Sequence, residues 1–475
     1  MKRISHSTKY LVINAPNFPR SSPSILIEPV DALTLATWIQ HNGNGVDFID
    51  IDRFGLNAIN DLTFSNYKAV LIVFDYLIPL YTSEAINHLG SLFELVSKRS
   101  DCILLAGRAA SYFPFEVLNR FPKLYGCIIG EPEIVLSELF KFNDLKLLKN
   151  NPNILTREDK VNKSKNLKKI ERENLYDLFP EKGPIANRKL CKFNQYIDVH
   201  SIISSRGCNG FCKFCSTSGY MGAWRSASPQ LVLSEIKHLV SLGAYKIIFL
   251  DDNFSSDQNR VKGIHELIKK NNIDIVWGCL CRIIDMDGEL LKQMYDAGCR
   301  WIHFGIEHGD QETRLSIGKN FSDEVAINVI QFAKNLGMRI RTSWILDLPE
   351  ATKESVKKTL ELARKISSHE IKFHFLALRP GSRYYNEFSC SKLFLNNKNT
   401  HETYIHKGKP HNTLSLELKK NIIDQFEKFK MEMNELDYQW VSGVTFWQRF
   451  DSKEALPDEK FLSTSIIKYG LGWKK

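Results

Sequence analysis

The first part of the chain alternates short apolar runs with amphipathic segments. The apolar runs predict strands, and a repeat near 3.6 residues between them predicts helices. Strands that alternate with helices form parallel βαβ units in an open, doubly wound sheet, which is a Rossmann-like α/β fold. Ligands of such sheets bind at the carboxyl ends of the strands. Strands are expected at 9–16, 46–52, 68–75, 101–107 and 126–130, and helices at 29–43, 82–98 and 131–140.

A second series of the same kind begins at residue 197. Several of its predicted helices end at a glycine, which is a common stop signal. Six βα units in a row predict a partial (βα)6 barrel, with functional residues at the carboxyl ends of its strands. Strands are expected at 198–205, 245–250, 275–280, 301–306, 338–346 and 371–378, and helices at 229–243, 261–271, 288–298, 323–337 and 353–366.

Two stretches lack this alternation. Residues 146–196 are polar and lysine-rich, and we predict a linker across the surface. Residues 386–475 contain one helical pattern and then an aromatic segment, so we predict a mainly helical C-terminal segment. The Rossmann-like domain is assigned to 1–145 and the barrel to 197–385. The aromatic residues are expected either to pack in a core or to cap the substrate cavity: Trp440, Phe446 and Trp447.

Composition changes this picture little. Hydrophobic residues make up 43% and charged residues 25%, as in ordinary globular proteins. The net charge of +10 comes from 64 basic and 54 acidic residues, and we interpret it as a solvated lysine-rich surface. No RNA-binding motif is visible. No segment has the ~20 apolar residues of a membrane span, and the first apolar run is too short for a signal peptide. We therefore expect a soluble, cytoplasmic protein.

Three of the ten cysteines lie close together. Cys208, Cys212 and Cys215 are spaced CxxxCxxC in a loop after the first barrel strand. Their thiolates can reach three irons of one cubane cluster, whereas four cysteines are the usual number. The fourth iron is then open to an amine and a carboxylate. The other seven are scattered, and buried structural thiols are the expectation for them: Cys102, Cys127, Cys191, Cys279, Cys281, Cys299 and Cys390.

Zinc and coincidence are the alternatives for the cysteine loop. Structural zinc usually takes four ligands in two pairs, and no second pair lies nearby. Coincidence is disfavoured because three cysteines fall within eight residues of a strand-to-helix loop. Gly207, Gly210 and Gly219 also permit a tight backbone path around a cluster.

The loop resembles that of the radical S-adenosylmethionine (SAM) superfamily, in which an aromatic residue, here Phe214, precedes the last cysteine. The resemblance covers residues 197–385 and is strongest to the branch with an N-terminal cobalamin-binding domain. The segments that carry it are SSRGC at 204–208, FLDDNFSSD at 249–257, FGIEHGDQE at 304–312 and LRPGSRYY at 378–385.

The resemblance implies a 4Fe-4S cluster on the three cysteines, with SAM bound to the open iron. One electron breaks the sulfur–C5′ bond of SAM and yields methionine and a 5′-deoxyadenosyl radical, which abstracts hydrogen from an unactivated carbon. The protein positions the substrate and excludes water. The expected partners are a small-molecule or natural-product substrate and an electron donor such as flavodoxin or ferredoxin. Neither a membrane nor nucleic acid is expected.

The resemblance also assigns contacts to SAM. Phe214 is expected near the adenine, and Asp251, Asp252 and Asn253 near the methionine amino group. A turn or helix N-cap is the structural alternative for these three. Arg282 is expected to pair with the methionine carboxylate as a bidentate donor, with a structural ion pair as the alternative.

Further contacts follow the fourth and fifth barrel strands. Glu307 is expected to accept hydrogen bonds from the ribose hydroxyls, and Ser343 is a second ribose candidate. The Gly-Pro element of the family is replaced by Asp-Leu-Pro at 347–349, which leaves the contacts there open. Three histidines near strand ends either line the substrate cavity or are structural: His303, His308 and His374.

Residues 9–140 resemble the cobalamin-binding domain found beside such barrels, through NAPNFP at 14–19 and IIGEPE at 128–133. The lower-ligand motif DxHxxG is absent, and larger residues at 75–77 and 106–109 narrow the expected site. Either cobalamin binds or a retained fold serves as a lid or docking surface. The residues assigned to cobalamin are Pro16, Gly107, Gly130 and Glu131.

Bound cobalamin would favour methylation of an unactivated centre. Without cobalamin, the barrel would support radical dehydration, epimerisation or rearrangement. A non-catalytic iron–sulfur protein is the remote alternative. Methylthiotransferases that act on tRNA carry a second cysteine triplet and a small RNA-binding domain, and neither is visible here, so we predict a single cluster and favour a methyltransferase.

Overall fold

The structure is a computed structural model, and the chain divides into two compact units. The first unit comprises Met1–Ile197 with Ser234–Leu242, and the second comprises Asp198–Leu233 with Gly243–Lys475. No helix of the described residues is both long enough and apolar enough to cross a membrane. The described residues are 9–15, 27–74, 83–159, 174–180, 183–196, 199–374, 376, 379–388, 415–436, 438–442 and 460–464.

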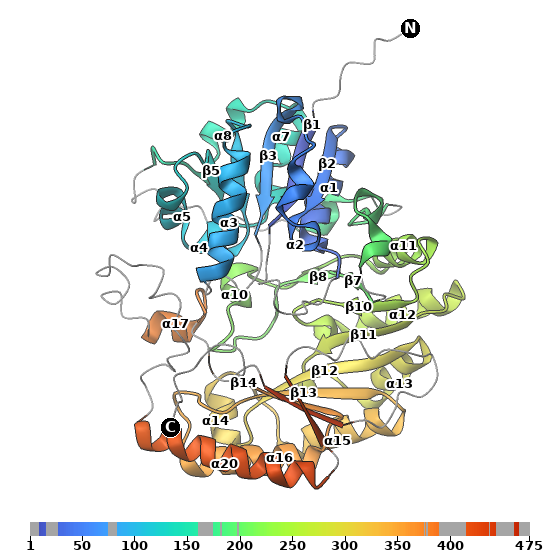
Figure 1. Cartoon of the computed structure of the whole chain (residues 1–475). Helices are drawn as coiled ribbons and strands as arrows, with labels where there is room; N and C mark the ends of the chain where they lie inside the picture. Colours follow the sequence, from blue (N-terminus) through green and yellow to red (C-terminus); the bar gives the residue numbers. More distant parts are fainter. Residues whose placement is uncertain are drawn as a thin grey trace. The chain divides into compact units, whose positions relative to one another are not determined.

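The first unit contains a six-stranded sheet in the order β2-β1-β3-β4-β5-β6. All neighbouring strands are parallel except the last pair. Apolar side chains fill both faces: Leu11 and Ile13 belong to one core cluster, and Tyr10 and Val12 to the other. A sheet buried on both faces is typical of doubly wound folds, so the predicted class is confirmed (Figure 1). The strands are β1 (Lys9–Asn14), β2 (Gly45–Asp50), β3 (Tyr67–Val73), β4 (Ile103–Ala106), β5 (Gly126–Ile128) and β6 (Ile154–Leu155).

The stretch predicted as a linker contributes structure to the first unit. It contains β6, which closes one edge of the sheet, and the short helix α8. Further along, Arg188 is fully buried and forms an ion pair with Glu235, whose Oε2 also accepts from Ile185 N at 2.6 Å. The helices of this unit are α1 (Val30–His41), α2 (Ile51–Phe54), α3 (Ser83–Val96), α4 (Arg108–Tyr112), α5 (Pro114–Arg120), α6 (Pro132–Val135), α7 (Ser137–Phe142) and α8 (Lys146–Asn150).

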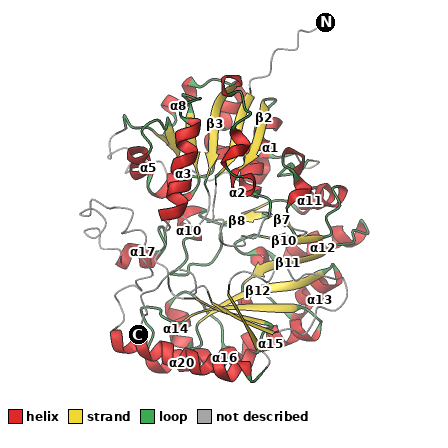
Figure 2. Cartoon of the chain, in the orientation of Figure 1, coloured by secondary structure: helices red, strands yellow, loops and turns green. Residues whose placement is uncertain are grey.

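The second unit contains an eight-stranded parallel sheet in the order β15-β16-β14-β13-β12-β11-β10-β7. Six of its strands follow one another as the predicted partial barrel, which is confirmed (Figure 2). The strands are β7 (His200–Ile202), β10 (Lys246–Phe249), β11 (Val276–Cys281), β12 (Cys299–Glu307), β13 (Arg339–Ile345), β14 (Glu370–His374), β15 (Tyr438–Ser442) and β16 (Lys460–Thr464), and a separate hairpin joins β8 (Ser205–Arg206) to β9 (Arg225–Ser226).

Helices cover the outer face of the barrel strands. Phe373 of β14 packs edge-on against Phe426 and Phe429 of α20, with ring centroids 5.2 and 5.5 Å apart. The helices are α10 (Thr217–Tyr220), α11 (Pro229–Ser241), α12 (Gln258–Lys270), α13 (Gly288–Asp296), α14 (Gln311–Ser316), α15 (Asp323–Asn335), α16 (Lys353–Ile366), α17 (Arg383–Phe388) and α20 (Leu416–Asn434).

The C-terminal segment differs from the expectation of a mainly helical segment. The predicted helix is α20, but β16 and β15 also extend the barrel sheet beyond β14. Trp440 lies on β15, and its side chain is not among those described. Phe446 and Trp447 lie outside the described residues, so their predicted packing remains a prediction.

Candidate functional site

The three clustered cysteines lie in the loop between β8 and α10, and their thiols are free and half-buried. Gly210 N donates to Cys208 Sγ at 3.3 Å, and Cys215 N donates to Cys212 O at 3.1 Å. Gly207 begins the loop with φ of 83°, and a Cβ there would lie 2.5 Å from the carbonyl oxygen of Ala223. Glycine is therefore needed at this close approach.

A carboxylate after β10 bridges the two ends of the cysteine loop. Asp252 Oδ2 accepts from Gly207 N at 3.3 Å, and its Oδ1 accepts from Thr217 Oγ1 at 2.9 Å. Asp252 thus links Gly207, just before the first cysteine, to Thr217, which follows the last cysteine. Asp252 was predicted to contact the methionine amino group, and the structure shows it holding the loop that carries the cluster ligands.

The opposite side of the loop is held by two other segments. Lys213 N donates to Ile317 O at 3.1 Å, and Lys213 O accepts from Tyr384 N at 3.0 Å. The Tyr384 hydroxyl donates to Glu350, which also lies 3.5 Å from Lys213 Nζ. The turn after β10, the end of α14 and the start of α17 therefore fix the path of the loop.

The donor set suits a cluster better than a single metal ion. Within the described residues, no three His, Cys, Asp or Glu side chains converge closely enough to hold one ion. The three thiols nevertheless lie within electrostatic reach of one another. A cubane takes each thiolate on a different iron, so its ligands need not converge. Burial raises the pKa of the Cys208 and Cys212 thiols, and Arg282 and Lys319 oppose that rise, respectively.

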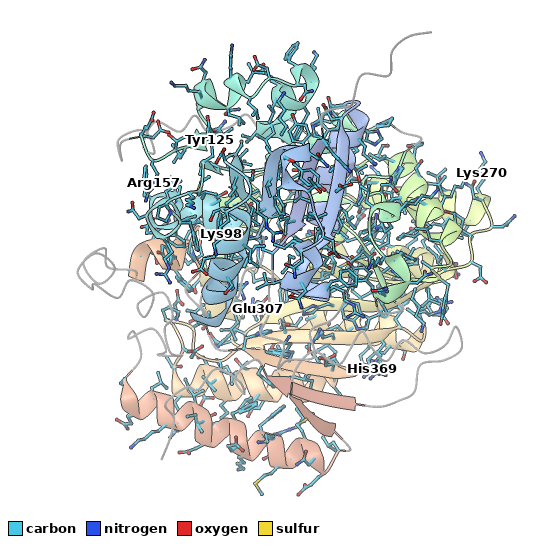
Figure 3. All side chains as sticks on the ribbon, turned by 45° about the horizontal axis from the view of Figure 1, so that its top comes forward. Lys98, Tyr125, Arg157, Lys270, Glu307 and His369 are labelled. Atoms are coloured by element: carbon cyan, nitrogen blue, oxygen red, sulfur yellow. The ribbon has the colours of Figure 1, made fainter. Side chains whose placement is uncertain are left out.

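Glu307 ends β12 in a strained conformation. Its φ is 72°, which non-glycine residues rarely adopt, and the register of β12 against β13 shifts between Gly305 and Glu307. The carboxylate lies over Gly305, where a Cβ would collide with Glu307 Oε1. Burial raises the pKa of Glu307, and the neighbouring Lys319 acts in the opposite direction. Figure 3 labels Glu307 at the end of the barrel strands opposite His369, which precedes β14.

Lys319 joins Glu307 to the cysteine loop. Its Nζ donates to Gly305 O at 3.0 Å and lies 3.4 Å from Glu307 Oε1. Gly318 before it packs on the cysteine loop, since a Cβ there would lie 2.9 Å from Phe211 O. Lys319 is buried, and its charge also acts on Cys212.

A shallow hollow is bordered by residues that follow β11 and by the turn after α14. Arg282 and Lys319 both line it, and a Cβ at Gly210 would lie 3.7 Å from Arg282 Cζ. Arg282 Nε is buried and has no hydrogen-bond partner in the described part of the chain. Guanidinium and ammonium groups are the side chains that commonly bind carboxylates. The full lining is Arg282, Ile283, Ile284, Gly305, Lys319, Asn320 and Phe321.

Asn253 is engaged within the protein. Its Nδ2 donates to Ser256 Oγ and to Asp285 Oδ2, both at 2.7 Å, and its Oδ1 accepts from Ser255 Oγ at 2.9 Å. Both ends of the fully buried amide are therefore occupied by the turns after β10 and β11. This geometry directs Asn253, one of the predicted SAM contacts, to an internal role.

Asp251 is also structural. It is fully buried and accepts from Ser204 N, Ser204 Oγ and Ser205 Oγ at 2.6–2.7 Å. Arg260 Nη2 donates to the carbonyl oxygen of Ser204 at 2.9 Å. These bonds attach the segment that leads into the cysteine loop to the end of β10. Phe214 is half-buried on that loop.

The predicted ribose and cavity candidates on later strands fall into two groups. Ser343 Oγ and His303 Nε2 are hydrogen-bonded at 2.6 Å on the inner face of the barrel. His374 lies on the next strand and is half-buried. His308 is fully buried, its Nδ1 accepts from Asp310 N at 3.2 Å, and burial lowers its pKa to about 4. Burial therefore favours the neutral imidazole of His308, whose Nδ1 bonds to the turn that begins α14.

In the first unit, the predicted cobalamin contacts that are described lie at the carboxyl ends of β4 and β5. Gly107 and Gly130 have φ of 108° and 95°, which side chains rarely allow. Gly130 N donates to Ser111 Oγ at 3.0 Å, which ties the two loops together. Glu131 is buried at the start of α6. Pro16 and residues 75–77 lie outside the described residues.

Residues 202–363 match the family model of the Radical SAM superfamily. This part of the chain belongs to that superfamily. An uncharacterized methyltransferase of Pyrococcus horikoshii is 26% identical over 351 residues, which cover 70% of this chain and 74% of the relative. The predicted family and the assignment as a radical SAM enzyme are confirmed.

Two solved structures share the architecture. The radical SAM methyltransferase TsrM from Kitasatospora setae, solved with cobalamin and a [4Fe-4S] cluster, has a TM-score of 0.66 at 16% identity and covers 80% of this chain and 78% of TsrM. The cobalamin-dependent radical SAM enzyme OxsB, solved with aqua-cobalamin, has a TM-score of 0.62 at 19% identity. That match covers 75% of this chain and 52% of OxsB. At these identities the likeness concerns the fold.

Several residues of the radical SAM site are not evident from the sequence. Lys319 follows a short helix within a polar turn, and Glu350 lies in a segment without a repeating pattern. Tyr384 lies in the segment LRPGSRYY, but the sequence assigns it no role. The only sequence signal for Lys319 is the adjacent glycine, whose φ of 87° marks a close turn. Long-range packing brings these residues to the cysteine loop.

Proposed function

We propose that this radical SAM enzyme holds a 4Fe-4S cluster on Cys208, Cys212 and Cys215 and cleaves SAM to a 5′-deoxyadenosyl radical. The radical abstracts hydrogen from a small-molecule substrate, which is then methylated at an unactivated centre. One observation carries the proposal: three free thiols lie in a loop clamped at the carboxyl ends of the barrel strands, beside a buried carboxylate and two cations. The named methyltransferase relative supports the reaction class.

Different residues around the cysteine loop bind different parts of SAM. Arg282 and Lys319 bind the methionine carboxylate, because both border the hollow near the cysteine loop. Glu307 accepts hydrogen bonds from the ribose hydroxyls, and Lys319 favours its ionised form. Phe214 contacts the adenine from the same loop. Asp252 positions the loop through its bonds to both ends, and the methionine amino group approaches it from the cluster side.

The cluster, when bound, supplies one electron to the sulfonium, so that the sulfur–C5′ bond breaks into methionine and a carbon radical. The chain itself must hold C5′ toward the substrate and keep water away. Ser343 and His303 lie deeper in the barrel and face the substrate side. An electron donor such as flavodoxin or ferredoxin is required to reduce the cluster.

Cobalamin binding is the second part of the proposal. TsrM and OxsB were solved with cobalamin, and the first unit shares their doubly wound fold. Gly107 and Gly130 leave bare backbone at the carboxyl ends of two neighbouring strands, where ligands of such sheets bind. Glu131 and Pro16 complete the proposed contacts. When bound, cobalamin would carry a methyl group supplied by a second SAM, distinct from the one that is cleaved to the radical.

One observation favours the alternative class of reactions, in which cobalamin is not bound. Arg108 follows Gly107 directly and begins α4, so a long side chain stands at the expected corrin site. If cobalamin is excluded, hydrogen abstraction leads to dehydration, epimerisation or rearrangement. The cluster chemistry and the SAM contacts are the same in both cases.

Anaerobic reconstitution tests both parts of this proposal. The full chain is supplied with iron, sulfide, excess hydroxocobalamin and SAM, and is then reduced with dithionite. We expect stoichiometric corrin absorbance, a cluster absorbance, and formation of 5′-deoxyadenosine. Deoxyadenosine without bound corrin would support the cobalamin-independent alternative. Absence of deoxyadenosine from cluster-loaded protein would contradict both reaction classes.

A further inference from the structure

Three neighbouring strands carry a row of polar side chains on the inner face of the barrel. The parallel register pairs His303 with Arg341 and Arg341 with Glu370. The next row pairs Ser343 with Lys372. The alternate positions of these strands point outward, as the packing of Phe373 on α20 shows.

Some side chains in this row form an ion pair or a hydrogen bond with one another. Arg341 Nη2 lies 2.6 Å from Glu370 Oε1, and both side chains are almost fully buried. Ser343 Oγ and His303 Nε2 share the short hydrogen bond already described. These bonds fix the walls of the inner face and leave one exchangeable hydroxyl or imidazole proton available to a ligand.

Other members have no such partner. No hydrogen bond or ion pair joins the side chains of Lys372, His374 or Arg379 to another residue within the described ranges. Lys372 and His374 are half-buried on β14, and Arg379 follows in the segment before α17. All three side chains are therefore only partly buried, and those of Lys372 and His374 lie on the inner face of β14.

The charges in this region are unbalanced. Lys372 is acted on by Arg341 and Arg379, with Glu370 as the one acidic group. His374 is acted on by cations alone, namely Lys372, Arg379 and Arg341. Of the carboxylates already described, Glu370 pairs with Arg341 and Glu307 with Lys319. Asp347, which follows β13, accepts from Leu376 N at 2.6 Å.

Unpaired cations in a poorly solvated interior are unfavourable unless an anion joins them. Burial and neighbouring cations lower the pKa of Lys372 to about 7, and burial lowers the pKa of His303 and His374 well below its ordinary value. A bound anion would relieve the repulsion between Lys372 and Arg379. A neutral or cationic ligand would not.

We propose that the inner face formed by Lys372, His374 and Arg379, with Ser343 and His303 beside them, binds an anionic group of the substrate. The group is a carboxylate or a phosphate-type oxyanion. This inference rests on the proposed function and names the class of its substrate. Arg379 acts on both Lys372 and Glu307, so the anion site adjoins the proposed ribose contact.

The carboxylate of SAM is the other possible source of an anion. Arg282 and Lys319 border a hollow near the cysteine loop and are the proposed partners of that group. The substrate and SAM therefore place their anions at different cations. An experiment that follows both ligands separates the two sources.

The test titrates inorganic phosphate, and separately acetate, into the reconstituted full chain saturated with S-adenosylhomocysteine and without reductant. Calorimetry then gives the dissociation constants of the wild type, Lys372→Met and Lys372→Arg. We expect Lys372→Met to weaken anion binding at least tenfold, Lys372→Arg to retain most of it, and neither to change the affinity for S-adenosylhomocysteine. Lys357→Met is the matched control, because that lysine is exposed on α16 and its loss changes the net charge equally.

Three outcomes would overturn the inference: no anion binding by the wild type, equal weakening by Lys357→Met, or loss of S-adenosylhomocysteine affinity in Lys372→Met with anion binding intact. A melting curve of each variant shows whether it folds, and Lys372→Arg keeps the test valid if Lys372→Met does not. The titration needs no turnover. Failure to form 5′-deoxyadenosine would thus contradict the proposed function without affecting this result.

Discussion

Lys319 Nζ lies 3.4 Å from Glu307 Oε1 and donates to Gly305 O at 3.0 Å, so one buried lysine holds the carboxylate at the end of β12. The same lysine follows the turn that packs on the cysteine loop. The pair therefore joins the proposed ribose contact to the proposed cluster site.

Replacing Lys319 with methionine should weaken both folding and SAM binding. The change leaves Glu307 buried without its cation, and loss of one partner of a buried pair costs about 3 kcal/mol. We expect a lower free energy of unfolding and at least tenfold weaker binding of S-adenosylhomocysteine, measured by denaturation and calorimetry. Lys358→Met removes an exposed ion pair with Asp310 and should change neither by much. Equal effects of the two variants would contradict the assigned role of Lys319.

Gly305 should not tolerate a side chain. A Cβ would collide with Glu307 Oε1 and lie 3.1 Å from Lys319 Nζ, so Gly305→Ala must displace the pair. We expect a loss of about 1–3 kcal/mol in the free energy of unfolding and weaker S-adenosylhomocysteine binding. Gly90→Ala is the control, because its Cβ would meet only Phe121 at 3.9 Å and the site is helical. That change should stabilise the protein by about 0.5–1 kcal/mol. Unchanged affinity in Gly305→Ala would argue against Glu307 as a SAM contact.

Asp252 should govern how firmly the cluster is held. Asp252→Ala removes the bonds to Gly207 N and Thr217 Oγ1 and frees both ends of the cysteine loop. We expect reconstituted protein to lose iron several-fold faster to a chelator, with little change in melting temperature. Asp252→Asn keeps one acceptor and should be intermediate. Glu266→Ala, on the exposed face of α12, should match the wild type. Iron loss at the wild-type rate in Asp252→Ala would show that the loop does not depend on this carboxylate.

The low pKa of Lys372 predicts a stability change with pH. Its folded pKa is about 7, below the ordinary value of 10.5, so the unfolded chain binds more protons between these values. Stability contributed at this site therefore rises as pH increases from about 7 toward 10, because the buried lysine is then neutral. The groups around it are Arg341, Glu370, Arg379 and His374. We expect Lys372→Met to be more stable relative to the wild type at pH 7 than at pH 9.5, as measured by melting temperature. Added phosphate should reduce the difference in melting temperature between the variant and the wild type at pH 7. A difference in melting temperature that is the same at both pH values would mean that Lys372 has an ordinary pKa.

The fold was largely predictable because both units repeat one local pattern. Apolar runs and glycine-terminated helices depend on neighbouring residues, so β10 to β14 fall close to their predicted ranges. The strands β15 and β16 were not predicted as such. β16 pairs with β14, which is distant in sequence, and β15 pairs with β16. Neither segment carries an alternating pattern of apolar and polar residues.

The site was predictable only in part, for a related reason. The spacing of Cys208, Cys212 and Cys215 is local, and Arg282 and Glu307 follow recognisable strands. Lys319 reaches the site through a turn whose position depends on tertiary packing. Asn253 shows the reverse case, since a strand-end amide suited to a ligand instead bonds to Ser256 and Asp285.

The central claim is that the cysteine loop carries the cluster that cleaves SAM. Its most direct test is 5′-deoxyadenosine formation by anaerobically reconstituted Cys212→Ala, with Cys102→Ala as the matched control in the first unit. We expect Cys212→Ala to lose the cluster absorbance and all 5′-deoxyadenosine, and Cys102→Ala to retain both. Formation of 5′-deoxyadenosine by Cys212→Ala at the rate of the control would show that this loop does not carry the cluster.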